Sequence, residues 1–279
     1  MGMLALDFMV RALIAGALTG VMAPAVGTYI VQRRLSLLGD GLGHVAIAGV
    51  GLALLTGRAP VPIAIAVTVV GAVAIELLRQ SGRASGDVGL AILFYGGLAS
   101  GVLMAGLAGQ GAGTLSQYLF GSLTSVSNPD LAAVAVMAVV VLITALGLSP
   151  QLFAVCADED YARAQGLPTR ALNLIIVIMA AVTVAISMRT VGLLLVSALM
   201  VVPVATSQNL VLGFRRGLAT AMGLGLILAL AGVVASYYLD TATGATIVVL
   251  GVIVFVGTLP VNSVLERHRR ANRLEADEE

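Results

Sequence analysis

Residues 35–55, LSLLGDGLGHVAIAGVGLALL, form an apolar run whose ionisable side chains are Asp40 and His44. A membrane-spanning helix needs about 20 mostly apolar residues, so the run predicts one such helix over 35–57. Ionisable residues inside a span are costly and mark candidate functional sites. Four residues apart, Asp40 and His44 share a helix face, with His44 near mid-bilayer and Asp40 one turn closer to the cytoplasm.

The whole chain has the composition of a membrane protein. Of its 279 residues, 59% are hydrophobic and 10% are charged, against about 25% charged in soluble domains. This excludes an ordinary soluble enzyme or a disordered regulator. Further apolar stretches of spanning length lie at 8–31, 60–79, 88–108, 130–148, 171–188, 191–211, 217–238 and 244–262. The sequence predicts an all-α polytopic membrane protein, with 1–279 as a single transmembrane domain of nine spans, or eight if one segment is merged or lost.

The arginines predict the orientation of the spans. With nine spans and the charged tail 263–279 in the cytoplasm, twelve of the 15 arginines fall on the cytoplasmic side, as the positive-inside rule requires. The N-terminus is then outside, and the expected location is the cell's inner (plasma) membrane. A net charge of +1 argues against a nucleic-acid partner. Glu76 and Asp87, beside a cytoplasmic loop, are expected to pair with Arg79 or Arg83.

Missing residue types exclude several chemistries. All 15 basic residues are arginine, so the chain cannot carry the lysine of a phosphate-binding Walker loop or form a lysine Schiff base. Its single cysteine, Cys156, excludes an intrachain disulfide and a cysteine cluster. The chain is therefore not expected to be an enzyme, and energy from ATP would have to come from another subunit.

Two connecting segments differ from simple loops. Residues 109–128 are uncharged and rich in Gly and Ser, and we expect them at the outer surface or partly inside the membrane. Residues 156–170, CADEDYARAQGLPTR, start with three acidic residues, continue with helix formers and end with Gly166 and Pro168. These are helix start and stop signals, so a short helix on the cytoplasmic face is favoured over an irregular loop.

Asp40 and His44 together could bind one divalent cation from a single helix face. Imidazole suits zinc, iron, nickel or copper, and carboxylate suits manganese and other harder ions. The alternative is that the two side chains bond to each other and cap the helix without a ligand. Two ligands do not complete a site, so the others would come from another segment, a second copy or water. Pro203, inside VGLLLVSALMVVPVATSQNL, predicts a broken span of the kind that borders transport pathways.

Four segments resemble, in order, blocks of the permease subunits of zinc/manganese/iron ABC importers. They are RRLSLLGDGLGHVAIAGVGLA at 33–53, SGDVGLAILF at 85–94, YLFGSL at 118–123 and VGLLLVSALMVVPVATS at 191–207. The resemblance implies the metal-type ABC permease fold and a dimer, either a homodimer or one with a related permease. Two cytoplasmic ATPase subunits and an extracytoplasmic metal-binding protein are the implied partners.

The resemblance also implies roles for residues. Asp40 and His44 would line the path of a transported divalent metal, Mn, Zn or Fe, with no permanently bound cofactor. Residues 158–166 would be the coupling helix that enters a groove on the ATPase. Its contact residues would be Asp158, Glu159, Asp160, Tyr161, Ala162, Arg163 and Gly166.

Two other functions fit the residues alone. A secondary or proton-coupled transporter would use Asp40 and His44 as a proton relay. A scaffold protein of the membrane would transport nothing.

Overall fold

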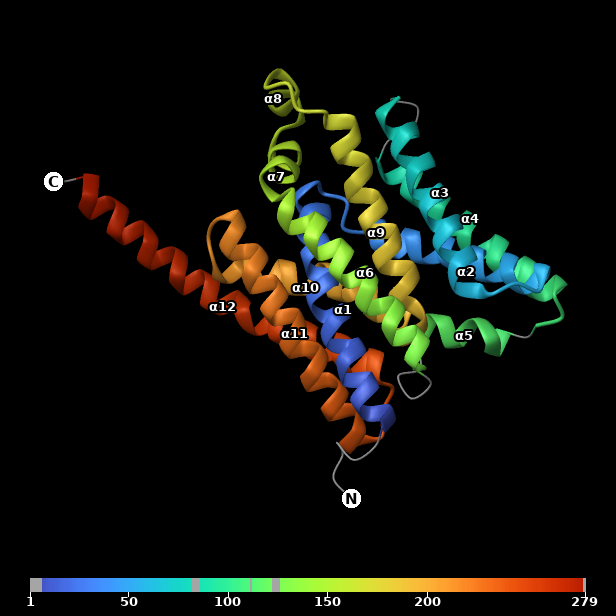
Figure 1. Ribbon diagram of the computed structural model, residues 1–279. Helices are drawn as coiled ribbons and strands as arrows, with labels where there is room; N and C mark the ends of the chain where they lie inside the picture. Colours follow the sequence, from blue (N-terminus) through green and yellow to red (C-terminus); the bar gives the residue numbers. More distant parts are fainter. Residues whose placement is uncertain (1–6, 82–85, 111, 122–125, 278–279) are drawn as a thin grey trace.

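The computed structural model describes residues 7–81, 86–110, 112–121 and 126–277, with side chains described up to Pro260 except at 86, 87 and 112. This part of the chain folds into twelve helices (Figure 1). They are α1 (Asp7–Gln32), α2 (Leu38–Thr56), α3 (Pro60–Gln80), α4 (Gly86–Leu107), α5 (Ala112–Phe120), α6 (Asn128–Gly147), α7 (Ser149–Ala157), α8 (Glu159–Ala164), α9 (Thr169–Val191), α10 (Leu193–Leu210), α11 (Phe214–Leu239) and α12 (Thr243–Asp277).

Within the described residues, nine of these helices are long and apolar enough to cross a membrane. They coincide with the nine predicted segments, which confirms nine spans in place of eight. The helices α2 and α9 are the most deeply buried, while α3, α4, α6 and α12 lie at the periphery. The α2 helix therefore runs through the protein interior for most of its length.

The α2 helix begins at Leu38, three residues later than predicted. Arg34 adopts a left-handed conformation with φ of 58°, and the Leu35 amide donates to the Ile30 carbonyl at 3.0 Å. This closes α1 and leaves a short connection before α2. His44 consequently lies about 9 Å from the start of α2 and about 18 Å from its end, nearer one end of the span than predicted.

Successive spans alternate in direction, so that α7 and α8 lie at the end of the bundle opposite the start of α1 (Figure 1). The α8 end also holds the α1–α2 connection with Arg33 and the start of α11 with Arg215. Arg58 directly follows α2, and Arg189, near the end of α9, pairs with Asp130 at the start of α6, so both lie at the other end. Among the residues whose side chains are described, these arginines thus fall into the two groups that the positive-inside argument assumed.

Glycines let helix backbones approach closely at several helix crossings, two of which bear on the site and its support. A Cβ added to Gly20 in α1 would lie 2.6 Å from the Gly225 carbonyl oxygen of α11. A Cβ added to Gly97 in α4 would lie 2.6 Å from the His44 carbonyl carbon of α2. Small residues permit such contacts in membranes, and the second contact places α4 directly on the part of α2 that carries His44.

The segment 109–128 contains α5, a nine-residue helix at the end opposite α8. Where α5 ends, the backbone at Phe120 and Gly121 contacts the backbone at Val191 and Gly192, between α9 and α10. Both glycines have positive φ, 72° and 89°. This contact fixes α5 against the break between two spans.

The expectation of a break at Pro203 is wrong. The α10 helix runs from Leu193 to Leu210 through this proline, which is buried. Proline removes one backbone donor, and neighbouring helices compensate for this in membrane proteins. The α9–α10 boundary lies instead at Gly192, whose φ of 89° suits glycine.

The α12 helix continues beyond its apolar part as far as Asp277. The predicted charged tail 263–279 therefore begins as a continuation of a spanning helix. Its side chains lie outside the described residues, as do those of Arg83 and Asp87.

Candidate functional site

The α2 helix places Asp40 and His44 one above the other. His44 Nε2 lies 4.0 Å from Asp40 Oδ1, as expected for residues one turn apart on one face. The Asp40 side chain is 41% exposed and the His44 side chain 11%. The pair therefore combines an open carboxylate with a nearly enclosed imidazole.

Phe94 of α4 holds the His44 ring from the side. The two ring centroids are 4.0 Å apart and the planes are inclined by 63°, an edge-to-face arrangement that aromatic rings favour. His44 Nδ1 is buried and has no hydrogen-bond partner within the described part of the protein. The imidazole is thus positioned by packing, and its Nε2 is directed towards Asp40.

A groove of about 260 Å³ opens beside Asp40, between α2 and α4. It is lined by Leu37, Gly41, Leu90, Ala91, Phe94 and Tyr95 in addition to Asp40. Tyr95 is largely exposed. A carboxylate and a phenol therefore face outwards from membrane-spanning helices, on a surface that is otherwise apolar.

Asp40 and His44 do not complete a metal site within this chain. No group of three His, Cys, Asp or Glu side chains that could hold a metal ion occurs among the described residues. Structural zinc sites use four protein ligands. The arrangement can give a dication two donors, which suits a site that must both bind and release its ion.

The polar segment 156–170 forms α8, as predicted. The Asp158 carboxylate accepts a hydrogen bond from the Tyr161 amide at 2.9 Å, an N-cap, and Ala162 is fully buried. Arg163 pairs with Glu159 at 3.1 Å and with Asp160 at 3.6 Å. Tyr161 and Gly166 are exposed, and Gly166 has φ of 82° where the helix ends. The helix therefore presents a charged face away from the bundle.

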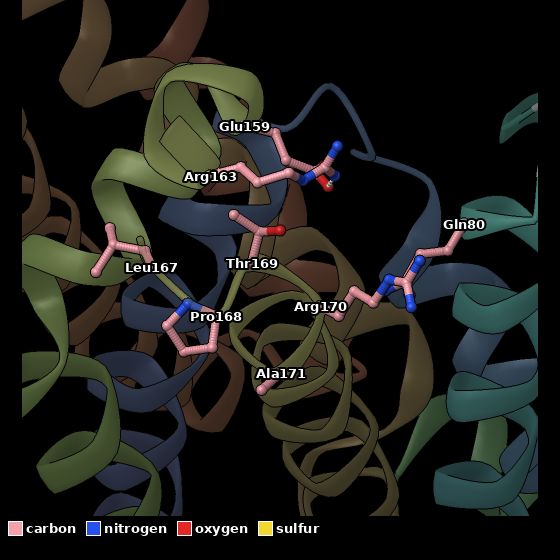
Figure 2. A pocket seen from close by; sticks show the side chains of 8 residues that line it. All are labelled: Gln80, Glu159, Arg163, Leu167, Pro168, Thr169, Arg170 and Ala171. Atoms are coloured by element: carbon pink, nitrogen blue, oxygen red, sulfur yellow. Dashed lines mark hydrogen bonds and ion pairs between the residues drawn. The ribbon is translucent and has the colours of Figure 1, made fainter. Parts of the chain in front are cut away.

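A cavity of about 650 Å³ lies between α8, the start of α9 and the end of α3. Its lining consists of Gln80, Glu159, Arg163, Leu167, Pro168, Thr169, Arg170 and Ala171. Figure 2 shows the guanidinium of Arg170 directed towards Gln80, across the cavity from the Glu159–Arg163 pair. The end of α3, which packs on α2, thus lines the same cavity as α8.

Comparison with known proteins identifies the family of the chain. The model of the ABC 3 transport family matches residues 5–262. The chain belongs to the ABC 3 transport family. It is thus a membrane subunit of ABC transporters in which a separate subunit hydrolyses ATP, in agreement with the missing lysine.

Individual members of the ABC 3 family resemble the chain over most of its length. It is 31% identical over 276 residues to the manganese transport system membrane protein MntC of Halalkalibacterium halodurans. This match covers 97% of this chain and 94% of that protein. It is 27% identical over 257 residues to the high-affinity zinc uptake system membrane protein ZnuB of Haemophilus influenzae, covering 91% and 97%. A chain of PsaBC from Streptococcus pneumoniae, solved in complex with Fab, matches with a TM-score of 0.80, 25% identity and 92% of both chains covered.

The sequence alone did not reveal two aromatic neighbours of the Asp40–His44 pair, nor the partner of Arg33, in this ABC 3 family chain. Phe94 ends the segment SGDVGLAILF and Tyr95 follows it, but their distance from Asp40 along the chain hides the contact. Arg33 was assigned only to orientation, yet its side chain pairs with Glu76 at 3.3 Å. The predicted pairing of Glu76 with Arg79 is confirmed at 2.8 Å.

Cys156 ends up in a protected position at the α8 end. Burial raises the pKa of its thiol to about 12, although the nearby Arg33 guanidinium acts in the opposite direction. The thiol lies 3.7 Å from the Tyr29 carbonyl oxygen. It is therefore protonated and unreactive at neutral pH.

Proposed function

We propose that this chain forms the path by which an ATP-driven importer carries a divalent transition metal across the membrane. The observation that carries the proposal is the Asp40–His44 pair, stacked at 4.0 Å inside a spanning helix and beside an open groove. Carboxylate and imidazole together suit manganese, zinc and ferrous iron. The relatives named for manganese and zinc transport support the same class of substrate.

A second copy of the permease completes the site in this proposal. Asp40 and Tyr95 lie on a face of α2 and α4 that also exposes Ile92, Val102 and Leu103. A carboxylate on a surface within the membrane needs a protein or water partner, because lipid offers none. A copy related by a two-fold axis would cover this face and bring a second Asp40–His44 pair to the ion.

The chain's role in energy coupling is assigned to α8. Its exposed charges and the neighbouring cavity support a contact with a cytoplasmic ATPase subunit, and the arginine distribution supports a cytoplasmic location for α8 and for the tail. An extracytoplasmic metal-binding protein would deliver the ion at the α5 end. Movement of α8 would then alternate the side from which the Asp40–His44 pair is accessible.

Metal accumulation in cells tests the proposed site. A strain that lacks its own uptake system is complemented with the parent chain and its partner subunits, and Mn, Zn and Fe contents are measured with each metal limiting. Asp40→Asn and His44→Gln are expected to abolish accumulation at normal membrane expression. Asp7→Asn, which changes an exposed carboxylate at the start of α1, serves as the control and should behave as the parent. Unchanged accumulation in His44→Gln would refute the site.

Co-purification tests the coupling helix. Arg163→Glu reverses the charge that pairs with Glu159 and Asp160 on α8, and Gly166→Leu forces a branched side chain into a left-handed backbone conformation. Both variants should lose the ATPase subunit during purification, whereas Arg58→Glu at the opposite end should retain it. Full retention of the ATPase in both α8 variants would count against this assignment.

A further inference from the structure

Glu76 is a buried carboxylate that the proposed metal path does not use. It lies near the α8 end of α3, and its side chain is 2% exposed. Arg79 donates two hydrogen bonds to it, at 3.0 Å and 2.8 Å, and Gln80 donates one at 3.0 Å. These three bonds come from α3 itself and already satisfy both carboxylate oxygens.

Arg33 reaches the same carboxylate from a different element. It follows α1 in the short connection before α2, and its Nη2 lies 3.3 Å from Glu76 Oε1. The Arg33 side chain is 5% exposed, and its Nη1 is buried without a hydrogen-bond partner among the described residues. The Arg33 guanidinium is therefore shielded from water, and its one side-chain hydrogen bond among the described residues is the 3.3 Å contact with Glu76.

The Glu76 carboxylate does not need the Arg33 contact to be paired and hydrogen-bonded, because Arg79 and Gln80 already bond both of its oxygens. Arg79 is 31% exposed and neutralises the carboxylate from the water-accessible side. Burying a second, incompletely bonded guanidinium costs free energy that a purely structural pair would avoid. The contact instead joins the α1–α2 connection, which holds Arg33, to α3, which holds Glu76.

On one side, Arg33 is connected rigidly to the candidate metal site. The Arg33 amide donates to the Tyr29 carbonyl at 3.1 Å, and the Leu38 amide to the Leu35 carbonyl at 2.8 Å. Only six residues separate Arg33 from Asp40: four belong to the α1–α2 connection and two to the first turn of α2. A displacement of Arg33 therefore displaces the start of α2 and, with it, Asp40.

On the other side, Glu76 is connected to α8 through Gln80. The Gln80 amide that donates to Glu76 also lines the cavity that Glu159 and Arg163 of α8 line (Figure 2). The end of α3 is thus the wall that α8 faces across this cavity. Movement of α8 towards the end of α3 would therefore act, through Gln80, on Glu76, the residue that Arg33 contacts.

We propose that Glu76 and Arg33 are positioning residues that link α8 to the metal-carrying helix α2, so that movement of α8 changes the placement of Asp40. This inference rests on the proposed function. Because both charges are buried, their separation is costly, and α3 and the α1–α2 connection move as one body at this point.

Two arginine variants distinguish this link from a structural role. Arg33→Met removes the link but leaves Glu76 paired with Arg79, and Arg79→Met removes the stronger, bidentate contact but keeps the link. Each chain is reconstituted with its ATPase subunit and its metal-binding protein in proteoliposomes, and the Mn²⁺ or Zn²⁺ transported per ATP hydrolysed is measured. Melting temperatures of the same complexes report folding.

We expect Arg33→Met to lower the metal transported per ATP by about tenfold, within the usual range of coupling between sites. Arg79→Met should lower it by less than about twofold, although it removes two hydrogen bonds and lowers the melting temperature more. Arg33→Lys keeps the charge and should restore most of the coupling. A structural role predicts the opposite order, with Arg79→Met the more damaging in both measurements.

The outcomes separate this inference from the function on which it rests. Suppose that the parent complex transports metal with ATP. If Arg33→Met then transports as much metal per ATP as the parent, or if Arg79→Met transports less metal per ATP than Arg33→Met, the link is refuted and the proposed function stands. If Arg33→Met does not fold, Arg33→Lys decides in its place: coupling below that of Arg79→Met would overturn the proposal. A parent complex that hydrolyses ATP but moves no metal refutes the proposed function itself.

Discussion

The close crossing of α2 and α4 makes Gly97 a position where one added methyl group acts directly on the backbone of the candidate site. In Gly97→Ala the new Cβ would lie 2.6 Å from the His44 carbonyl carbon and 2.7 Å from the Val45 amide nitrogen. These are backbone atoms and cannot rotate away. Ordinary contact starts at 3.4 Å, so the helices must separate by about 0.8 Å, and overpacking of this kind costs about 1–3 kcal/mol.

The expected result is a lower melting temperature and weaker metal uptake. For a chain of this size, 1 kcal/mol corresponds to roughly 2–4 °C, so Gly97→Ala should melt about 2–12 °C below the parent. Separation of the helices also moves Phe94 from the His44 ring, which it contacts at 4.0 Å between centroids. Uptake should therefore fall even at temperatures where the variant is fully folded.

The chain offers its own reporter and control for this measurement. Cys156 is the single cysteine and is shielded, so a fluorogenic maleimide reacts as the protein unfolds on heating. Gly96→Ala adds the same methyl group one residue earlier, where nothing lies within 4 Å. Both changes raise helix propensity equally, so their difference isolates the clash. Equal melting temperatures for the two variants would refute the reasoning.

Three further predictions follow from local contacts. Tyr29→Phe removes the buried hydrogen bond from the Tyr29 hydroxyl to the Ala145 carbonyl at 2.6 Å and should lower the free energy of unfolding by about 1 kcal/mol, seen as an earlier denaturation midpoint; an unchanged midpoint would contradict it. Burial raises the pKa of Cys156 to about 12, so at pH 8 it should react with iodoacetamide about 10³-fold more slowly than an exposed cysteine. The exposed cysteine is introduced by Ala164→Cys in a Cys156→Ser background. The reaction rate of Cys156 should still rise with pH above 9. Asp158→Ala removes the cap of α8 and should speed amide exchange in that helix while α9 is unaffected, whereas equal exchange in parent and variant would show that the cap does not hold α8.

The spans could be predicted because their signal is local. Each needs only a run of apolar residues of sufficient length, and charges or Gly and Pro end it. The short helix α8 was predictable for the same reason, since its cap at Asp158 and its end at Gly166 lie within nine residues. The stacking of Asp40 on His44 also needed only the helical repeat.

Features that depend on tertiary packing were not predictable from the sequence. Arg33 and Glu76 are 43 residues apart, and nothing in their neighbourhoods marks them as partners. The Phe94–His44 contact depends on the α2–α4 crossing at Gly97, one glycine among 33. Pro203 was misjudged because the consequence of a lost backbone donor depends on the helices packed around it.

The backbone contact between Gly121 and Gly192 determines where the bundle can bend. No side chain separates the two segments there, so a rotation of helices that keeps this contact would have to turn about it. A rotation of about 5° around it moves atoms about 30 Å away, at the far membrane surface, by roughly 2.5 Å. A small rotation would thus displace the α8 end more than the backbone beside Gly121 and Gly192, so opening at the α5 end would have to come from spans that lie away from this contact.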